Sequence, residues 1–338
     1  CPNSFPLNDT VQINASQNFT GMNWMPGSGI NHVMTGSQIY QLCNYGGLRL
    51  DNGLLAHFSG ITRMASSYSR TIETNNTEMF GRLIFSGVGS YSLLDDLYMP
   101  ASVIEHYSGS FFTNGHYINA RNYLANYLPY VGLYFEYNTG TSVFYIHGNA
   151  SFSFYQNLHT LNTDNTTIYM LYPSPYLYVS GTYQQMRFKS VFFENTIGKA
   201  SLLSSYYDYP VSFQNISFAA NGRIYGSNYF DTLALTEGNI YELESGAIQE
   251  IQNKLISKGS PCLRTTIQST TPGTCAKIYN ANCDLEIEHA RLRDIEAVDN
   301  GCSINHYIID VGGENLGNNP NWTFIPGDPI NGLGPDTI

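Results

Sequence analysis

Apolar and polar residues alternate along much of the first 235 residues. Short runs rich in β-branched and aromatic residues are separated by Gly, Pro, Asn or Asp. Successive side chains of a strand point to opposite faces, so this pattern predicts β-strands with one buried and one exposed face. The clearest runs cover residues 11–15, 37–43, 130–137, 142–147, 167–172, 176–183 and 186–193.

Asn-Gly pairs lie between apolar runs at 52–53, 114–115 and 221–222. Asn-Gly favours the tight turns that join antiparallel strands, so these positions predict hairpins. No helix of ten or more residues is indicated between most of the strands, which argues against a parallel α/β sheet. No repeat of fixed period is visible, so a solenoid is not expected. The predicted fold is mainly β, an antiparallel β-sandwich or jelly-roll-like arrangement.

The charge density changes near position 236. Residues 1–235 carry 21 charged side chains, whereas residues 236–299 carry 16 in a much shorter stretch. This shift predicts two domains, a Tyr-rich β-sandwich region over 1–235 and a smaller α+β, disulfide-containing domain over 236–338. Apolar residues at helical spacing predict a helix near 239–258, followed by Gly259 as a stop. An extended tail rich in Gly, Asn and Pro follows from about residue 303.

Charged residues make up only 12% of the 338 residues, and the net charge is −11. Phosphate groups are bound mainly by Lys and Arg, so an acidic chain without a basic run argues against nucleic-acid and anionic-membrane partners. No run of eighteen apolar residues is present, so no membrane-spanning helix is expected. The chain starts at Cys1 without an apolar leader, which we interpret as a mature form whose targeting segment has been removed.

The six cysteines are even in number and unevenly spaced. An even count outside the cytosol predicts disulfides, and the long interval without cysteine favours one bridge near the N-terminus and two near the C-terminus. Zinc binding is disfavoured because no C-x-x-C pair with His partners occurs, and a lipidated Cys1 stays an alternative to a bridge. The candidate disulfide residues are Cys1, Cys43, Cys262, Cys275, Cys283 and Cys302.

Eight N-x-S/T sequences mark candidate N-glycosylation sites. Together with few Lys and many Tyr, Asn, Ser, Thr and Gly, they predict a secreted glycoprotein at an extracellular location or on the surface of a cell or virion. The candidate acceptors are Asn8, Asn14, Asn18, Asn75, Asn149, Asn165, Asn215 and Asn321.

Tyrosine is unusually abundant, with 27 residues, many of them between positions 169 and 209. A tyrosine presents a flat apolar ring with a polar tip, which suits sugar stacking and protein interfaces. The alternative is that these tyrosines pack the faces of strands. The candidate ligand-binding residues are Tyr172, Tyr176, Tyr178 and Tyr207.

Motifs for catalysis are missing from the sequence. It contains no nucleophile elbow, zinc-protease helix, phosphate-binding loop, dinucleotide motif or EF-hand loop, so no cofactor and no metal are predicted. Asp95, Asp96 and Glu105 are the first acids to consider for a carbohydrate-active hydrolase, because two carboxylates suffice for glycoside hydrolysis. A plain turn at the two aspartates is the alternative.

Residues 10–21 suggest a route to assembly. Val11, Ile13 and Ala15 alternate with polar residues near a chain end, and such a strand can add to the sheet edge of a neighbouring subunit. The alternative is that it pairs within its own domain. The sequence favours a non-enzymatic structural subunit of a filament, surface layer or coat, self-associating as a homopolymer. The alternatives are a domain that binds a host glycan or receptor, and a hydrolase.

Overall fold

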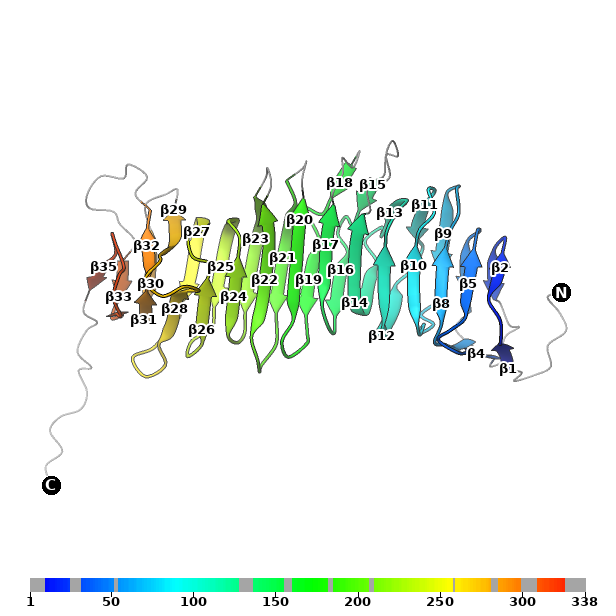
Figure 1. Ribbon diagram of the computed structural model, residues 1–338, viewed down its shortest axis with the longest axis horizontal. Coiled ribbons are helices and arrows are strands. Elements are labelled where there is room, and N and C mark those ends of the chain that lie inside the picture. The colour runs from blue at the N-terminus through cyan, green and yellow to red at the C-terminus, as the bar shows by residue number, and fades with distance from the viewer. Residues whose placement is uncertain are drawn as a thin grey trace, which may run out of the picture.

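The computed structural model shows an elongated rod of short strands stacked along its long axis (Figure 1). It describes residues 10–24, 32–51, 54–127, 136–154, 160–181, 185–206, 210–257, 259–280, 285–298 and 309–325. In these ranges all regular elements are strands, and they pair in parallel to form a β-solenoid of about 11 turns. The prediction of an antiparallel sandwich or jelly roll is therefore wrong.

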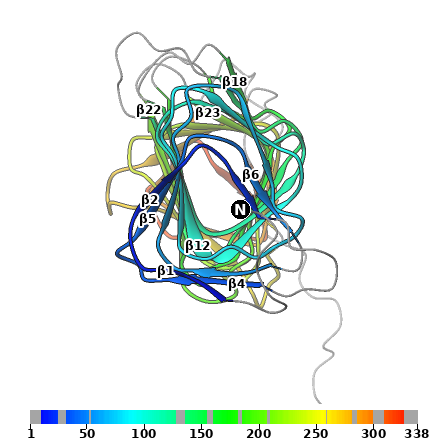
Figure 2. The ribbon, with the colours of Figure 1, turned by 90° about the vertical axis from the view of Figure 1, so that its right-hand side faces the viewer.

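The solenoid has three faces, each a sheet of parallel strands contributed by successive turns; the chain is seen coiling around the long axis in Figure 2. The first sheet contains β2 (Gln17–Phe19), β5 (Gln41–Asn44), β8 (Ile61–Met64), β10 (Arg82–Phe85), β17 (Ala150–Phe154), β20 (Tyr176–Gly181), β22 (Ala200–Tyr206), β24 (Gly222–Tyr225), β26 (Ile240–Leu243), β28 (Thr265–Ser269), β31 (Ala290–Arg293) and β34 (Glu314–Asn315). The second sheet contains β3 (Met22–Trp24), β6 (Leu48–Leu50), β9 (Arg70–Glu73), β11 (Ser90–Leu93), β13 (Ser110–Phe112), β15 (Glu136–Asn138) and β18 (Thr160–Asn162), followed by β29 (Ala276–Asn280) and β32 (Ile295–Ala297). The third contains β1 (Thr10–Ile13), β4 (His32–Gly36), β7 (Leu54–Phe58), β16 (Val143–Ile146), β19 (Thr167–Met170), β30 (Glu286–Glu288), β33 (Ile309–Val311) and β35 (Thr323–Ile325).

Six longer strands bend at a corner and contribute to two sheets. Two of them start in the third sheet and end in the first, β12 (Leu97–His106) and β14 (Tyr117–Tyr127). The other four start in the second sheet and end in the third, β21 (Arg187–Phe193), β23 (Val211–Phe218), β25 (Asn228–Leu235) and β27 (Ile248–Ser257). These bends join the three faces into one continuous coil.

The Asn-Gly turn at 114–115 forms a corner between sheets instead of a hairpin. Asn114 and Gly115 have the positive φ values that this pair favours, 54° and 83°. The turn closes with a hydrogen bond from the His116 N–H to the Thr113 carbonyl, 3.0 Å. It redirects the chain from the second sheet to the third. The same closing bond recurs in the turns that begin at Thr74, Thr139 and Thr163.

The repeat of the solenoid is irregular in length. In the first sheet Gly222 pairs with Tyr241, 19 positions later, whereas Ala150 pairs with Leu177, 27 positions later. Turn length varies because the corners absorb insertions while the strands stay in register. A search for one fixed period therefore misses this repeat.

The region predicted as a helix, 239–258, forms β26 and β27. Leu243, Ile251 and Leu255 are buried and lie at spacings of eight and four residues. Such even spacings fit one face of a strand as well as they fit a helix. The α+β character predicted for the C-terminal part is wrong for its described residues. β24 pairs with β26, and β25 with β27, so the solenoid continues through position 236.

The core is a column of inward side chains from the three sheets. In the first sheet each inward position lies on the equivalent position of the next turn. Such stacked apolar side chains bury one another along the rod. The column in this sheet runs through Ile104, Tyr123, Ala150, Leu177, Leu202, Ile224 and Leu243, all at most 2% exposed.

His106 is part of this core and not of a reactive site. Its ring packs near the rings of Phe85, Phe111 and Tyr137, with centroids 5.4–5.7 Å away. Burial lowers the pKa of His106 to about 3, so the ring is neutral, and Nε2 lies 2.9 Å from the Gly109 carbonyl oxygen. The His106 ring therefore packs among the aromatic rings of the core as a neutral group. In the described part of the chain, no helix has the length and hydropathy to cross a membrane.

Candidate functional site: a tyrosine-lined trough on the first sheet

Asp95, one of the predicted carboxylates, holds the backbone of the preceding turn. It lies at the corner after β11, and both of its oxygens accept the Thr74 N–H, at 2.8 and 2.9 Å. One of them also accepts the Asn75 N–H. A short polar side chain that accepts bonds from backbone N–H groups in this way is typical of turns. Asp95 is therefore part of a turn, which was the alternative to a site.

Asp96 and Glu105 do not meet each other. Asp96 accepts the Tyr117 N–H at 2.9 Å at the corner of the second and third sheets, whereas Glu105 lies on the first sheet. The Glu105 side chain is 5% exposed, pairs with Arg82 and accepts the Tyr107 hydroxyl at 2.6 Å. The hydrogen bond to Glu105 raises the pKa of Arg82. The three acids therefore do not form the carboxylate pair that a glycosidase needs.

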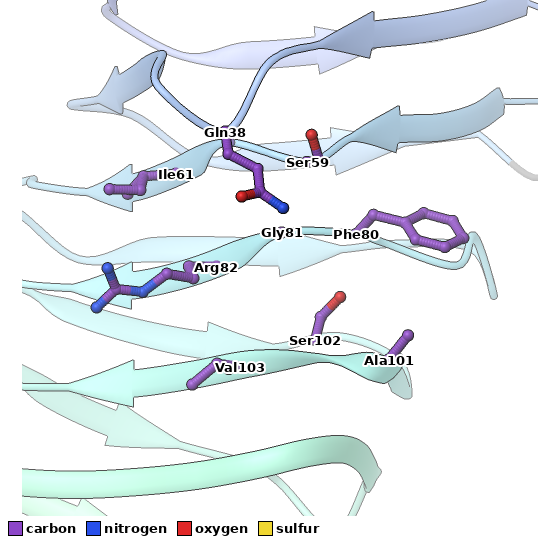
Figure 3. A pocket seen from close by; sticks show the side chains of 10 residues that line it. Gln38, Ser59, Ile61, Phe80, Gly81, Arg82, Ala101, Ser102 and Val103 are labelled. Atoms are coloured by element: carbon purple, nitrogen blue, oxygen red, sulfur yellow. The ribbon is translucent and has the colours of Figure 1, made fainter.

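A hollow of about 460 Å³ lies at the corner between the third and first sheets (Figure 3). Three of its four polar side chains, all except Gln38, are already used within the solenoid. Ser59 donates to the Gly36 carbonyl, and Ser102 donates to the Met79 carbonyl. Arg82 points along its strand, away from Gln38 in the view of Figure 3, and pairs with Glu105. Because these groups are committed, the hollow offers few contacts to a ligand.

A shallow trough on the outer surface of the first sheet is a better candidate. Two adjoining hollows of about 420 and 640 Å³ share the side chains of Tyr178, Leu203 and Tyr225. The first hollow is completed by Tyr176, Ser201 and Arg223, and the second extends to Glu244 and Ser245. We call this surface the trough.

Two parallel rows of outward residues form the trough, and each row takes one residue from each successive strand. The first row consists of Tyr176, Ser201, Arg223 and Glu242, on β20, β22, β24 and β26. The second row consists of Tyr178, Leu203 and Tyr225, and it ends near Glu244 just after β26. Neighbouring strands lie about 4.8 Å apart, so the rows run parallel to the long axis for roughly 14 Å.

The charged side chains of the trough are arranged around Glu242. One of its oxygens is 2.9 Å from Lys199 Nζ, and the other pairs with the Arg223 guanidinium. Burial disfavours the charged form of Glu242, but the bonds from the two cations outweigh this effect and lower its pKa. The Arg223 guanidinium also lies over the Tyr225 ring, 5.6 Å from the centroid, which helps to orient that ring.

The predicted ligand-binding tyrosines have different surroundings. Tyr176 and Tyr178 line the trough. Tyr172 is 45% exposed in the segment before β20 and is not among the lining residues, and Tyr207 lies outside the described residues. Sequence reasoning missed Leu203, Arg223 and Tyr225, because only the parallel register brings them beside β20.

Other outward aromatic side chains form a ladder on the third sheet. The Tyr145 and Tyr169 rings stack at 5.1 Å with planes 10° apart, and Tyr169 stacks on Phe192 at 5.0 Å. Tyr117 lies 6.2 Å from Tyr145 at the other end. We call these four residues the ladder. Rings that face one another along the axis turn only their edges outward, so the ladder is not a platform for sugar stacking.

The described cysteines are Cys43, Cys262 and Cys275, each with a free thiol. Cys1, Cys283 and Cys302 lie outside the described residues. The predicted pairing of the six cysteines therefore stays a prediction. Within the described ranges, no three His, Cys, Asp or Glu side chains come together in a way that could hold a metal ion.

The candidate glycosylation sites differ in exposure. Asn14, Asn18, Asn165 and Asn321 are exposed, Asn75, Asn149 and Asn215 are partly buried, and Asn8 lies outside the described residues. The nitrogen that would carry a glycan already donates to a carbonyl in Asn75 (to Leu50, 2.6 Å) and in Asn321 (to Ala297, 2.9 Å). An exposed amide without such a bond is the easier acceptor, which favours the first three exposed positions.

The predicted assembly strand pairs within its own chain. Val11 and Ile13 lie in β1, which pairs in parallel with β4 through Val11 with Met34. Ala15 lies beyond the end of β1 and is exposed. Pairing of β1 within its own chain is the alternative to strand exchange that the sequence left open. Exchange with a second subunit stays a prediction.

Comparisons with protein-family models, with curated proteins and with solved structures found no match for this chain. The function is therefore inferred from the geometry of the trough.

Proposed function

We propose that the protein is a non-enzymatic, extracellular glycan-binding protein whose solenoid presents the trough as its binding surface. The observation that carries this proposal is the spacing of Tyr178 and Tyr225. They lie on alternate strands with Leu203 between them, so the faces of their rings are not stacked on each other. Tyrosine rings separated by an apolar floor offer faces to the C–H surface of a sugar ring and hydroxyl groups to its polar edge.

The scaffold supports this role because Tyr178, Leu203 and Tyr225 lie on strands, while Glu244 and Ser245 lie in the turn after β26. Tyr178 and Tyr225 alternate with fully buried neighbours, Leu177 and Ile224, which fix the direction of the outward side chains. Little conformational entropy is then lost on binding, which helps a weak, shallow site to hold a ligand. The low charge and the exposed glycosylation sequences support an extracellular setting.

The proposal is tested by applying the purified protein to a glycan array and then measuring the affinity of the best glycan by calorimetry. Tyr178→Ala and Tyr225→Ala should each weaken binding about tenfold, because each removes one stacking surface. Tyr172→Ala is the control, because it removes an exposed tyrosine ring that does not line the trough. Circular dichroism should show unchanged strand content in all three variants.

Two results would contradict the proposal. One is the absence of any bound glycan at high protein concentration, and the other is a bound glycan whose affinity the trough variants do not change. The elongated rod also suits a structural subunit of a surface assembly. Regular filaments or sheets of native protein in negative-stain electron microscopy, together with an array that shows no binding, would make that second role the better one.

A further inference from the structure

The trough has a direction, because its two ends differ in chemistry. Tyr176, which is 40% exposed, and Tyr178 lie at the end formed by β20. Glu242 and Glu244 lie at the end formed by β26. Equivalent positions recur on every strand, so a ligand parallel to the long axis meets a new pair of row residues every 4.8 Å or so. A linear chain of sugar units fits this arrangement better than a compact ligand does.

Arg223 in the lining of the trough and Lys199 beside Glu242 are both already committed. Lys199 and Arg223 both pair with Glu242, one on each carboxylate oxygen. An anionic ligand that recruited either cation would leave one oxygen of Glu242 without its partner in a partly buried position. The trough therefore has no cation in reserve for a carboxylate or sulfate group on a sugar.

Glu244 differs from Glu242 in its partners. One of its oxygens accepts the Gly226 N–H at 2.6 Å, and no basic side chain of the described residues lies within ion-pair distance of it. Its carboxylate lies at the lining of the trough beside Ser245 and Tyr225. This leaves acceptor capacity that a ligand hydroxyl or ammonium group can use, because a carboxylate has two oxygens with several acceptor positions.

Resting on the proposed function, we propose that the trough selects linear oligosaccharides of neutral or amino sugars, aligned with the long axis, and that Glu244 is the residue that determines this specificity. A hydroxyl or ammonium group at the β26 end donates to Glu244, and the sugar rings pack on Tyr225 and Tyr178. Acidic sugars are rejected because their carboxylates approach Glu244 while Arg223 stays paired with Glu242.

The test uses three oligosaccharides of equal length as probes, measured by calorimetry at pH 6 and low salt. They are a glucosamine oligomer, an N-acetylglucosamine oligomer and a galacturonic acid oligomer. The expected order of affinity is amino, then neutral, then acidic, with about tenfold between the first and the last. Glu244→Gln keeps the shape of the side chain and should reduce the amino-over-acidic ratio about tenfold while changing the neutral affinity little.

Glu237→Gln is the matched control, because Glu237 is an exposed carboxylate outside the lining of the trough. It removes the same charge and should leave the order of the three probes unchanged. The proposed specificity is wrong if the acidic oligomer binds as tightly as the amino oligomer, or if Glu244→Gln leaves the order of affinity unchanged. If Tyr178→Ala still weakens binding in that case, the proposed function stands without the specificity. If no probe and no array glycan binds at all, the proposed function itself fails.

Discussion

The ladder on the third sheet and the trough on the first sheet are both outward rows that contain tyrosine, yet their rings are arranged differently. In the ladder, Tyr145, Tyr169 and Phe192 occupy consecutive strands and stack at 5.0–5.1 Å. In the trough, Tyr178 and Tyr225 occupy alternate strands with Leu203 between them. Rings on consecutive strands stack on one another, whereas rings on alternate strands do not, although the Arg223 guanidinium lies over one face of Tyr225.

The difference follows from the spacing of parallel strands. About 4.8 Å separates neighbouring strands, which is close to the best distance for two stacked rings. Twice that distance is too large for direct contact but leaves room for a ring from outside. The register of the rows, and not the composition of the chain, therefore decides which tyrosine rings stack on one another and which do not.

Leu203→Tyr is expected to have the largest effect, because it converts the trough into a second ladder. A ring at position 203 would lie between Tyr178 and Tyr225 at stacking distance and occupy the space of the ligand. Glycan binding should fall about a hundredfold, while the free energy of unfolding stays the same or rises. Calorimetry for binding and urea denaturation for stability measure the two effects.

The matched control is Ser217→Tyr, which extends the ladder itself, since Ser217 pairs with Phe192. It adds the same ring to the surface of another sheet and should leave binding unchanged. If Leu203→Tyr binds glycan as well as the wild type does, the contrast between alternate and consecutive rings is not the basis of binding.

Tyr169→Ala is expected to have a smaller effect, on stability alone. It removes the ring that contacts both Tyr145 and Phe192, and each such contact contributes about 0.5–1.5 kcal/mol. The free energy of unfolding should fall by about 1–2 kcal/mol in urea denaturation, with glycan affinity unchanged. Tyr178→Ala should show the reverse, a large loss of affinity and a smaller loss of stability. Equal losses of stability in both variants would contradict the separate roles of the two rows.

The strands were predictable from the sequence where alternation is strong and local. The predicted run at 142–147 contains β16, and the run at 176–183 contains β20. The direction of pairing was not predictable in the same way. Each strand pairs with a strand one turn away, and the length of a turn varies between neighbouring coils. The Asn-Gly turn predicted at 114–115 is present, but it leads around a corner to another sheet and does not form a hairpin. A tight turn fixes the local bend of the chain and does not fix which strand the next strand pairs with.

The trough was only half predictable for the same reason. Tyr176 and Tyr178 stand out in the sequence because they lie in a tyrosine-rich segment. Leu203 and Tyr225 join Tyr178 through offsets of 25 and then 22 residues, as their register shows. No single period gives both offsets, so these residues became visible only with the register. The recurring threonine turns, such as those at Thr113 and Thr139, are the signal that could have located the coils.

The two rows also differ in their response to pH. In the trough, the bonds from Lys199 and Arg223 overcome burial and lower the pKa of Glu242, so its contribution is present above the usual carboxyl pKa and is lost as the pH falls through the lowered value. In the ladder, burial first, and then the neighbouring Tyr169 and Tyr117, raise the pKa of Tyr145. Its contribution is present below the usual tyrosine pKa and is lost as the pH rises through the raised value.

The smallest expected effects therefore lie at opposite ends of the pH range. Affinity for the neutral oligosaccharide should be constant from about pH 8 to about pH 5 and fall a few-fold below about pH 4, as Glu242 is protonated and Arg223 loses the partner that orients it over Tyr225. Stability should decline above about pH 10 in the wild type, and less so in Tyr145→Phe, which keeps the ring but cannot ionise. A loss of affinity that begins near pH 6, or an alkaline decline identical in Tyr145→Phe, would place the titrating groups outside these two rows.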